Sequence, residues 1–200
     1  MTCPCDPSSP SRFKTFSIPR KVSKSLTFQA VHAILSRMNS QPLALKLPQP
    51  NTSIRPVQRE DTAALSALWP HRTELDVLWL IKRAQQQATQ GRGLGIVVTD
   101  ERSDEAIAYG QITLWHRAAE IADLAVLDCH RCRGLGTVLV QHLVTAANQM
   151  HAKRIEIGVA ISNPRALALY HRLGFLEHRT VLIDLGHGGE PVVYLNIDLQ

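Results

Sequence analysis

The sequence lacks an apolar run of the roughly 18 residues that a membrane-spanning helix needs, and it has no N-terminal stretch flanked like a secretory signal. Its four cysteines form two close pairs, Cys3/Cys5 and Cys129/Cys132, rather than the spread framework of a disulfide-stapled secreted domain. We therefore expect a soluble, cytoplasmic protein without a membrane partner. The 200 residues, 44% of them hydrophobic, suit one domain of about 150 residues plus an extension.

Acidic residues are scarce in the first fifty positions, where seven Lys/Arg stand against Asp6 alone. Of the totals of 22 basic and 17 acidic residues, 15 and 16 then fall in residues 51–200. The net charge of +5 thus comes from a segment that need not touch a site in the nearly neutral remainder, so nucleic acid is not expected as a partner. We divide the chain into a basic, disordered or leader-like extension (1–50) and a folded domain (51–200).

The extension is open to two interpretations. Its Ser- and Pro-rich, acid-poor composition resembles an organelle transit peptide, which leaves import through residues 1–38 open beside a cytoplasmic location. Alternatively, an upstream start codon adds these residues and Met38 is the working initiator. Both interpretations make the segment dispensable for the fold.

From Thr52 onward, short alternating segments and helical apolar spacing follow one another. A first helix begins after Asp61, whose side chain is expected to cap it. Further helices are expected at residues 73–90 and 135–150 and after Asn163-Pro164, and strands at residues 53–57, 94–99, 106–115, 119–127, 155–159, 175–185 and 191–199. This order predicts an α/β (α+β) domain with a mixed sheet.

A short basic loop, Arg131-Cys132-Arg133-Gly134-Leu135-Gly136, joins a strand to a long amphipathic helix. The glycines let the backbone approach a ligand, and the first N–H groups of a helix lack internal partners and favour an anion. A similar glycine-rich motif occurs at Gln90-Gly91-Arg92-Gly93-Leu94-Gly95. There the following residues, Ile96-Val97-Val98, are expected to form a strand and not a helix, so we interpret this second motif as a turn.

This loop between strand and helix, followed by a strand and by an Asn163-Pro164 helix ending in Leu173-Gly174-Phe175, resembles the GNAT (N-acetyltransferase) superfamily over about residues 52–199. The resemblance implies a central mixed sheet of about seven strands with helices on both faces, in a monomer or homodimer. It also implies transfer of an acetyl group from acetyl-CoA to a primary amine by direct attack in a ternary complex. Small amines, amino acids, peptide N-termini and lysine side chains all remain open as acceptors.

In that family a bulge splays the central strand, here residues 119–126, from its neighbour, and the pantetheine arm of the cofactor pairs with the freed backbone. The resemblance implies that the N–H of Leu124 points at the thioester oxygen, that the loop holds the pyrophosphate and that Asn163 touches the pantetheine. The implied cofactor-binding residues are Leu124, Ala125, Val126, Arg131, Cys132, Arg133, Gly134, Leu135, Gly136, Thr137 and Asn163.

Amide formation from an alkylammonium requires a base, and the departing thiolate requires an acid. Glu120 matches the glutamate that serves as base in the histone acetyltransferase branch of the family; a solvated strand-end glutamate is the alternative. Asp123 has the opposite strand parity and is therefore expected on the other face. Tyr170, the candidate acid, lies about 10 Å along the helix from Asn163 on nearly the same face. Its alternative role is that of a core tyrosine.

The acceptor is expected to lie against the first two helices and the last hairpin, near Trp69, His71, Arg72, Glu74, Trp79 and His187. No metal is expected, because ligation by the Cys129/Cys132 pair would compete with the cofactor in the same loop. A catalytically silent acyl-CoA-binding or regulatory module is the alternative function, since a fold does not guarantee turnover. Glu120 and Tyr170 favour the enzyme.

Overall fold

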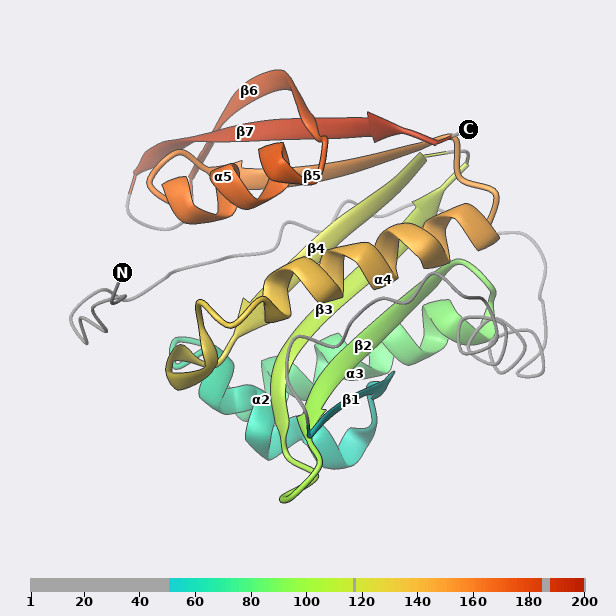
Figure 1. The fold of residues 1–200 in the computed structure, drawn as a ribbon, viewed down its shortest axis with the longest axis vertical. Helices are drawn as coiled ribbons and strands as arrows, with labels where there is room; N and C mark the ends of the chain where they lie inside the picture. Colours follow the sequence, from blue (N-terminus) through green and yellow to red (C-terminus); the bar gives the residue numbers. More distant parts are fainter. Residues whose placement is uncertain (1–50, 117, 185–187, 200) are drawn as a thin grey trace.

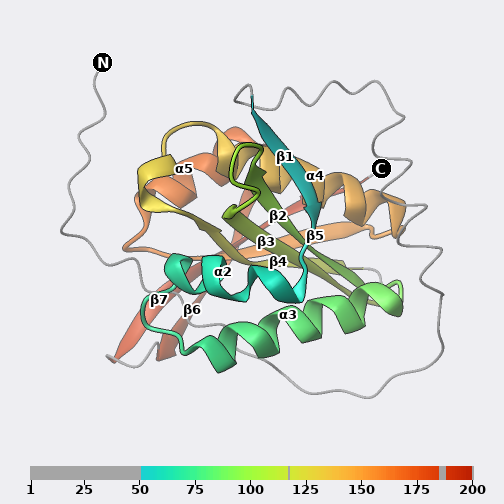
Figure 2. The same cartoon turned by 90° about the horizontal axis from the view of Figure 1, so that it is seen from below.

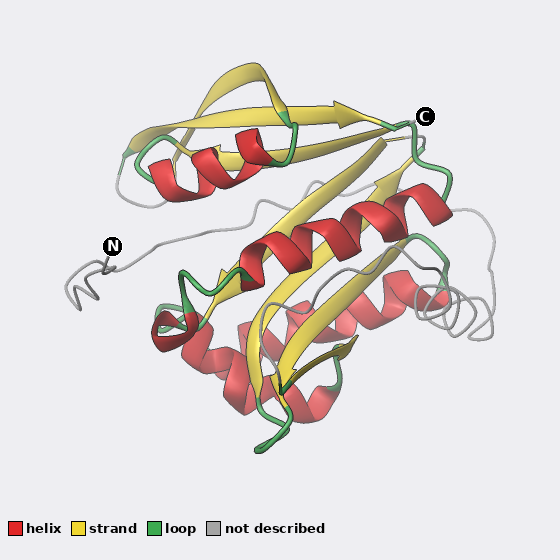
Figure 3. Cartoon of the chain, in the orientation of Figure 1, coloured by secondary structure: helices red, strands yellow, loops and turns green. Residues whose placement is uncertain are grey.

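The computed structural model describes residues 51–116, 118–184 and 188–199. Our expectations for residues 1–50 and for His187 lie outside these described residues. In the described part, a seven-stranded sheet carries four α-helices and two short 3-10 turns (Figure 1, Figure 3). The strands are β1 (Thr52–Pro56), β2 (Gly93–Asp100), β3 (Ala106–Trp115), β4 (Ala118–Val126), β5 (Arg154–Ala160), β6 (Leu176–Asp184) and β7 (Gly189–Asp198). The helical elements are η1 (Arg59–Asp61), α2 (Thr62–Leu68), α3 (Glu74–Thr89), η2 (Asp128–His130), α4 (Leu135–Gln149) and α5 (Pro164–Arg172).

The sheet order is β1-β2-β3-β4-β5-β7-β6, in which β4 and β5 run parallel and the other neighbours antiparallel. Helix α4 is the crossover that the parallel pair requires. The mixed sheet with helices on both faces confirms the predicted fold class (Figure 1). The strand bounds agree with the predicted ones to within two residues, because apolar alternation and turn residues mark them in the sequence.

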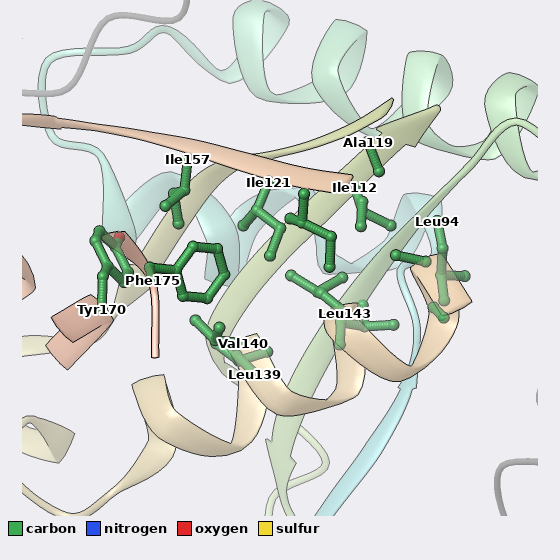
Figure 4. Packing of buried hydrophobic residues seen from close by; sticks show 14 of the residues in the cluster. Leu94, Ile112, Ala119, Ile121, Leu139, Val140, Leu143, Ile157, Tyr170 and Phe175 are labelled. Carbon is green, nitrogen blue, oxygen red and sulfur yellow. The ribbon is translucent and has the colours of Figure 1, made fainter. Parts of the chain in front are cut away.

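Two hydrophobic clusters lie on the two faces of the sheet. Helices α4 and α5 pack on one face, where Leu139, Val140 and Leu143 point toward Ile112 and Ile121 of the strands (Figure 4). Helices α2 and α3 lie side by side under β2, β3 and β4 on the other face (Figure 2). Strands β2, β3 and β4 supply residues to both clusters, whereas β5 and β7 supply only the cluster on the α4 and α5 face. In the described ranges, no helix combines the length and apolar character that crossing a bilayer demands.

Asp61 occupies the N-cap position of α2, but its side chain does not cap that helix, so this part of the prediction was wrong. Its carboxylate instead accepts hydrogen bonds from Arg55 at 2.7 and 2.8 Å and from the Gln58 N–H at 2.7 Å. Because Asp61 is 5% exposed, a cation and a second donor offset its desolvation better than helix amides alone would.

The parallel pairing of β4 and β5 is short. It runs from Ala118 to Ile121 on β4, and beyond that point the two strands part (Figure 1). On the other side of β4, Tyr109 faces Ala125 and Gln111 faces Ala122, so Asp123 and Leu124 together oppose Gly110. This two-against-one arrangement is a β-bulge, and it bends β4 where the neighbouring strand leaves it.

Candidate active site

The loop after β4 presents unpaired amides at the start of α4. Gly134 has φ 83° and ends the loop, and helical bonding begins when the Val138 N–H donates to its carbonyl at 3.1 Å. Among the described residues, the N–H groups of Leu135, Gly136 and Thr137 have no hydrogen-bond acceptor. Partial positive charge therefore collects at this helix end, as an anion site requires.

Two arginines flank these amides in different ways. Arg131 turns back toward the strand: its Nε donates to the Val126 carbonyl at 3.3 Å, and it forms an ion pair with Asp128 at 2.5 Å. Arg133 is exposed. Cys132, with φ 60°, and its CxxC partner Cys129 are exposed in the same loop. Within the described ranges, no three His, Cys, Asp or Glu side chains gather in a way that could hold a metal ion.

Helix α5 packs closely on this loop. A Cβ added to Gly136 would lie 3.2 Å from a methyl of Leu169, so the glycine permits the two helices to approach. Asn163 caps α5, accepting from the Ala166 N–H at 3.1 Å, while its own N–H donates to the Ala160 carbonyl at 2.9 Å. The N-termini of both helices therefore follow the two strands that part, α4 after β4 and α5 after β5.

The unpaired edge of β4 faces the gap between the strands. The Leu127 N–H donates to the Ile107 carbonyl of β3 at 2.9 Å, so the N–H and C=O of Val126 point the other way. An extended acyl-thioester chain of coenzyme A, with its own amides, fits such an edge, and unpaired helix amides fit its diphosphate.

Tyr170 lies in the hydrophobic cluster on the α5 side of the sheet. It is 5% exposed, and its ring centroid is 6.2 Å from that of Phe175, with Ile157 of β5 beside both rings (Figure 4). Burial raises the pKa of the Tyr170 hydroxyl, which therefore keeps its proton at neutral pH. A core tyrosine and a proton donor are both compatible with this position, so its catalytic role stays a prediction.

Glu120 lies on the opposite face of β4 from the buried Ala119 and Ile121. Burial raises the pKa of the Glu120 carboxyl, a hydrogen bond from Trp115 lowers it, and the negative charges of Glu156 and Asp123 raise it again. Burial is the largest effect, so the pKa stands above the ordinary glutamate value. A carboxylate of this kind is a stronger base than a solvated one.

Asp123 shares the face of Glu120, so the prediction that it lies on the other face was wrong. Its carboxylate accepts from Gln111 Nε2 and from Arg72 Nη2, both at 2.7 Å, on the side covered by α2 and α3. The bulge adds one residue to β4, and Asp123 has φ 52°. An inserted residue shifts the alternation by one, so simple parity fails beyond it.

Residues on the strands beyond β4 were missed. Glu156 lies directly opposite Glu120 in the parallel register and forms an ion pair with Arg179 at 2.6 Å. The Arg179 guanidinium lies 4.3 Å from the ring centroid of Tyr194, and a Cβ added to Gly158 would lie 3.2 Å from that ring. The alternation Ile155-Glu156-Ile157 was the available signal, because it places Glu156 away from the apolar face.

Comparisons with known proteins give one family. A model described as acetyltransferase (GNAT) family matches residues 55–175. An uncharacterized N-acetyltransferase of Methanocaldococcus jannaschii is 29% identical over 107 residues, which cover 52% of this chain and 45% of that protein. An N-alpha-acetyltransferase of Sulfurisphaera tokodaii is 34% identical over 62 residues, covering 30% and 37%. The matches thus span less than half the length of these curated relatives.

Solved structures agree with the fold. A putative acetyltransferase from Salmonella typhimurium with its cofactor acetyl-CoA superposes with a TM-score of 0.64 at 17% identity, covering 76% of this chain and 95% of that one. A spermidine/spermine N-acetyltransferase from Vibrio cholerae gives a TM-score of 0.62 at 19% identity, covering 74% and 94%.

We expect Gly134→Ala to weaken coenzyme A binding about tenfold. A Cβ in the left-handed region costs about 1–2 kcal/mol, and the loop relieves this strain by leaving the conformation that presents the amides. Isothermal titration calorimetry with coenzyme A measures the change in Kd.

Gly91→Ala is the matched control, because Gly91 has φ 63° in the loop with nearly the same letters that leads into β2. It is expected to lower the Tm about as much as Gly134→Ala while leaving the Kd for coenzyme A unchanged. Equal Kd values for both variants would contradict the anion site at α4.

Proposed function

The chain belongs to the acetyltransferase (GNAT) family, and we propose that it transfers an acetyl group from acetyl-CoA to a primary amine by direct attack in a ternary complex. The proposal rests on one observation: the unpaired amides at the start of α4 lie beside the gap that opens between β4 and β5. Acetyl-CoA supplies the activated acetyl group when bound. The relatives' names include an N-alpha-acetyltransferase and spermidine N-acetyltransferases, so both peptide and small-molecule amines are proposed as acceptor classes.

The cofactor-binding residues divide into two groups. The N–H groups of residues 135–137, with the positive charge of Arg131 and Arg133, hold the diphosphate. The backbone of residues 124–126 pairs with the pantetheine arm, and Asn163 contacts it from the start of α5. The exposed loop and the unpaired amides support this assignment.

Proton transfer involves the two faces of the sheet. Glu120 accepts the proton of the alkylammonium, directly or through a water molecule, so that the nitrogen lone pair becomes available. The raised pKa of the Glu120 carboxyl brings it closer to that of the amine and reduces the free energy of this transfer. Tyr170 donates its hydroxyl proton to the departing sulfur, and the Leu124 N–H stabilises the developing oxyanion.

The first test is a panel of amines. We expect amine-dependent release of free thiol from acetyl-CoA, with at least one acceptor among polyamines, amino acids, N-terminal peptides and lysine peptides. Thiol release is followed with a chromogenic disulfide, and the acetylated product by mass spectrometry. Binding of coenzyme A without release by any amine would instead favour a catalytically silent acyl-CoA-binding module.

Tyr170→Phe is expected to lower kcat about 10²-fold with the Kd for coenzyme A unchanged, because only the hydroxyl proton is lost. Steady-state kinetics and calorimetry measure the two constants. Tyr194→Phe removes a hydroxyl from the other face and is expected to retain most of kcat. Turnover of Tyr170→Phe at the wild-type rate would leave Tyr170 as a core residue.

The pH profile tests Glu120. A base must be deprotonated, so kcat/KM falls as the pH drops through the pKa of the Glu120 carboxyl, which burial raises from its ordinary value. Glu120→Gln is expected to lose this limb and about 10²-fold in kcat/KM. Glu156→Gln keeps the limb but moves it to lower pH, because a nearby negative charge is removed. A limb that persists in Glu120→Gln would exclude Glu120 as the base.

A further inference from the structure

A chain of buried polar side chains runs under the bulge of β4. The Tyr109 hydroxyl donates to Gln111 Oε1 at 3.0 Å, and Gln111 Nε2 donates to Asp123 Oδ2 at 2.7 Å. The second carboxylate oxygen, Oδ1, accepts from Arg72 Nη2 at 2.7 Å. The side chains of Arg72 and Asp123 are 12% and 3% exposed, so this ion pair is buried.

Arg72 comes from the segment between α2 and α3. Its N–H donates to the Trp69 carbonyl at 2.9 Å, and its guanidinium lies 4.7 Å from the centroid of the Trp69 ring. Trp69 in turn contacts Tyr109 edge-on, with centroids 5.6 Å apart. Arg72 is thus held in place by the aromatic ring while it holds the carboxylate of Asp123.

Asp123 has an unusual backbone for a residue with a side chain. Its φ of 52° is in the left-handed region, which glycine adopts freely and other residues enter at a cost. Such a conformation persists when the surroundings fix it. The bonds from Gln111 and Arg72 to its two oxygens are the interactions that do so.

The next residue is Leu124, whose N–H the proposed function aims at the thioester oxygen. Because the Asp123 dihedral angles set the orientation of the following peptide plane, they also set the direction of this N–H. A change in the Asp123 conformation therefore rotates the donor away from the oxygen. Catalysis by a preorganised donor depends on such alignment.

We propose that Arg72 is a positioning residue: through its buried ion pair with Asp123 it fixes the β4 bulge and aligns the Leu124 N–H with the acyl oxygen. The inference rests on the proposed function. It also links the segment between α2 and α3 to the donor on β4. Separating Arg72 from Asp123 would leave a buried carboxylate without its cation, which costs free energy. The segment between α2 and α3 and the bulge of β4 are therefore coupled.

The test compares kcat with coenzyme A affinity. Arg72→Met is expected to lower kcat about 10- to 100-fold while the Kd for coenzyme A changes less than twofold, because the diphosphate site at α4 is not touched. Asp123→Asn is expected to have a similar effect, and the double variant to lose no more than either single variant. Arg72→Lys keeps the charge without the planar contact to Trp69 and is expected to recover part of kcat.

Arg55→Met is the matched control. Arg55 forms a part-buried ion pair with Asp61 at 2.7 Å, on β1 and η1, away from the bulge. Its loss is expected to lower the Tm with kcat unchanged. If Arg72→Met does not fold, Arg72→Lys carries the comparison with Arg55→Lys, because both substitutions retain the cation.

Amide hydrogen exchange gives a readout that does not depend on activity. Exchange of the Leu127 N–H, which donates to the Ile107 carbonyl just beyond the bulge, is expected to accelerate in Arg72→Met and not in Arg55→Met. An active wild type whose Arg72→Met variant keeps both kcat and the Leu127 exchange rate would overturn the inference alone. A wild type that transfers acetyl to no amine would instead overturn the proposed function and the catalytic part of the inference.

Discussion

The parallel pairing of β4 and β5 stops after Ile121, and the arrangement around the site follows from that interruption. A strand in the middle of a sheet normally has both edges bonded, because unpaired backbone groups that lose water cost free energy. Here no strand pairs with that edge of β4 beyond Ile121, and the Arg131 Nε donates to the Val126 carbonyl. Helix α4 follows β4 and helix α5 follows β5, so under the proposed function the backbone edge and the helix amides bind one extended molecule.

The interruption is encoded by contacts across the sheet. Opposite the bulge lies Gly110, where an added Cβ would be 2.9 Å from a methyl of Leu124. A larger residue there would force the Leu124 side chain to move. Asp123 supplies the inserted residue, and its charge is offset by Arg72 from a segment 51 positions earlier in the chain. Gly110 and the Arg72–Asp123 ion pair thus contact the same bulge from the two faces of the sheet.

Local chemistry accounts for what the sequence could predict. The Gly134 loop, the Asn163-Pro164 start of α5 and the strand bounds depend on neighbours within a few residues, and all agree with the structure. Asp61 was misread because its carboxylate binds Arg55 of the preceding strand instead of the helix amides, and Asp123 because the bulge shifts the alternation of β4 by one residue. Glu156 was missed because its significance depends on register with Glu120, which no local pattern sets.

Burial raises the pKa of both candidate catalytic groups, but the chemical consequence differs between them. Removal from water disfavours the charged form of each, so the pKa of both Glu120 and Tyr170 rises. For the carboxylate, a higher pKa means a stronger base toward an ammonium proton. For the phenol, it means a proton that stays in place until negative charge develops on a nearby atom. Because Glu120 lies on the α3 face and Tyr170 in the α5 layer, the sheet separates the proposed proton acceptor from the proposed proton donor. In the proposed mechanism Glu120 acts on the attacking amine and Tyr170 on the departing sulfur, the two groups that are exchanged at the carbonyl carbon.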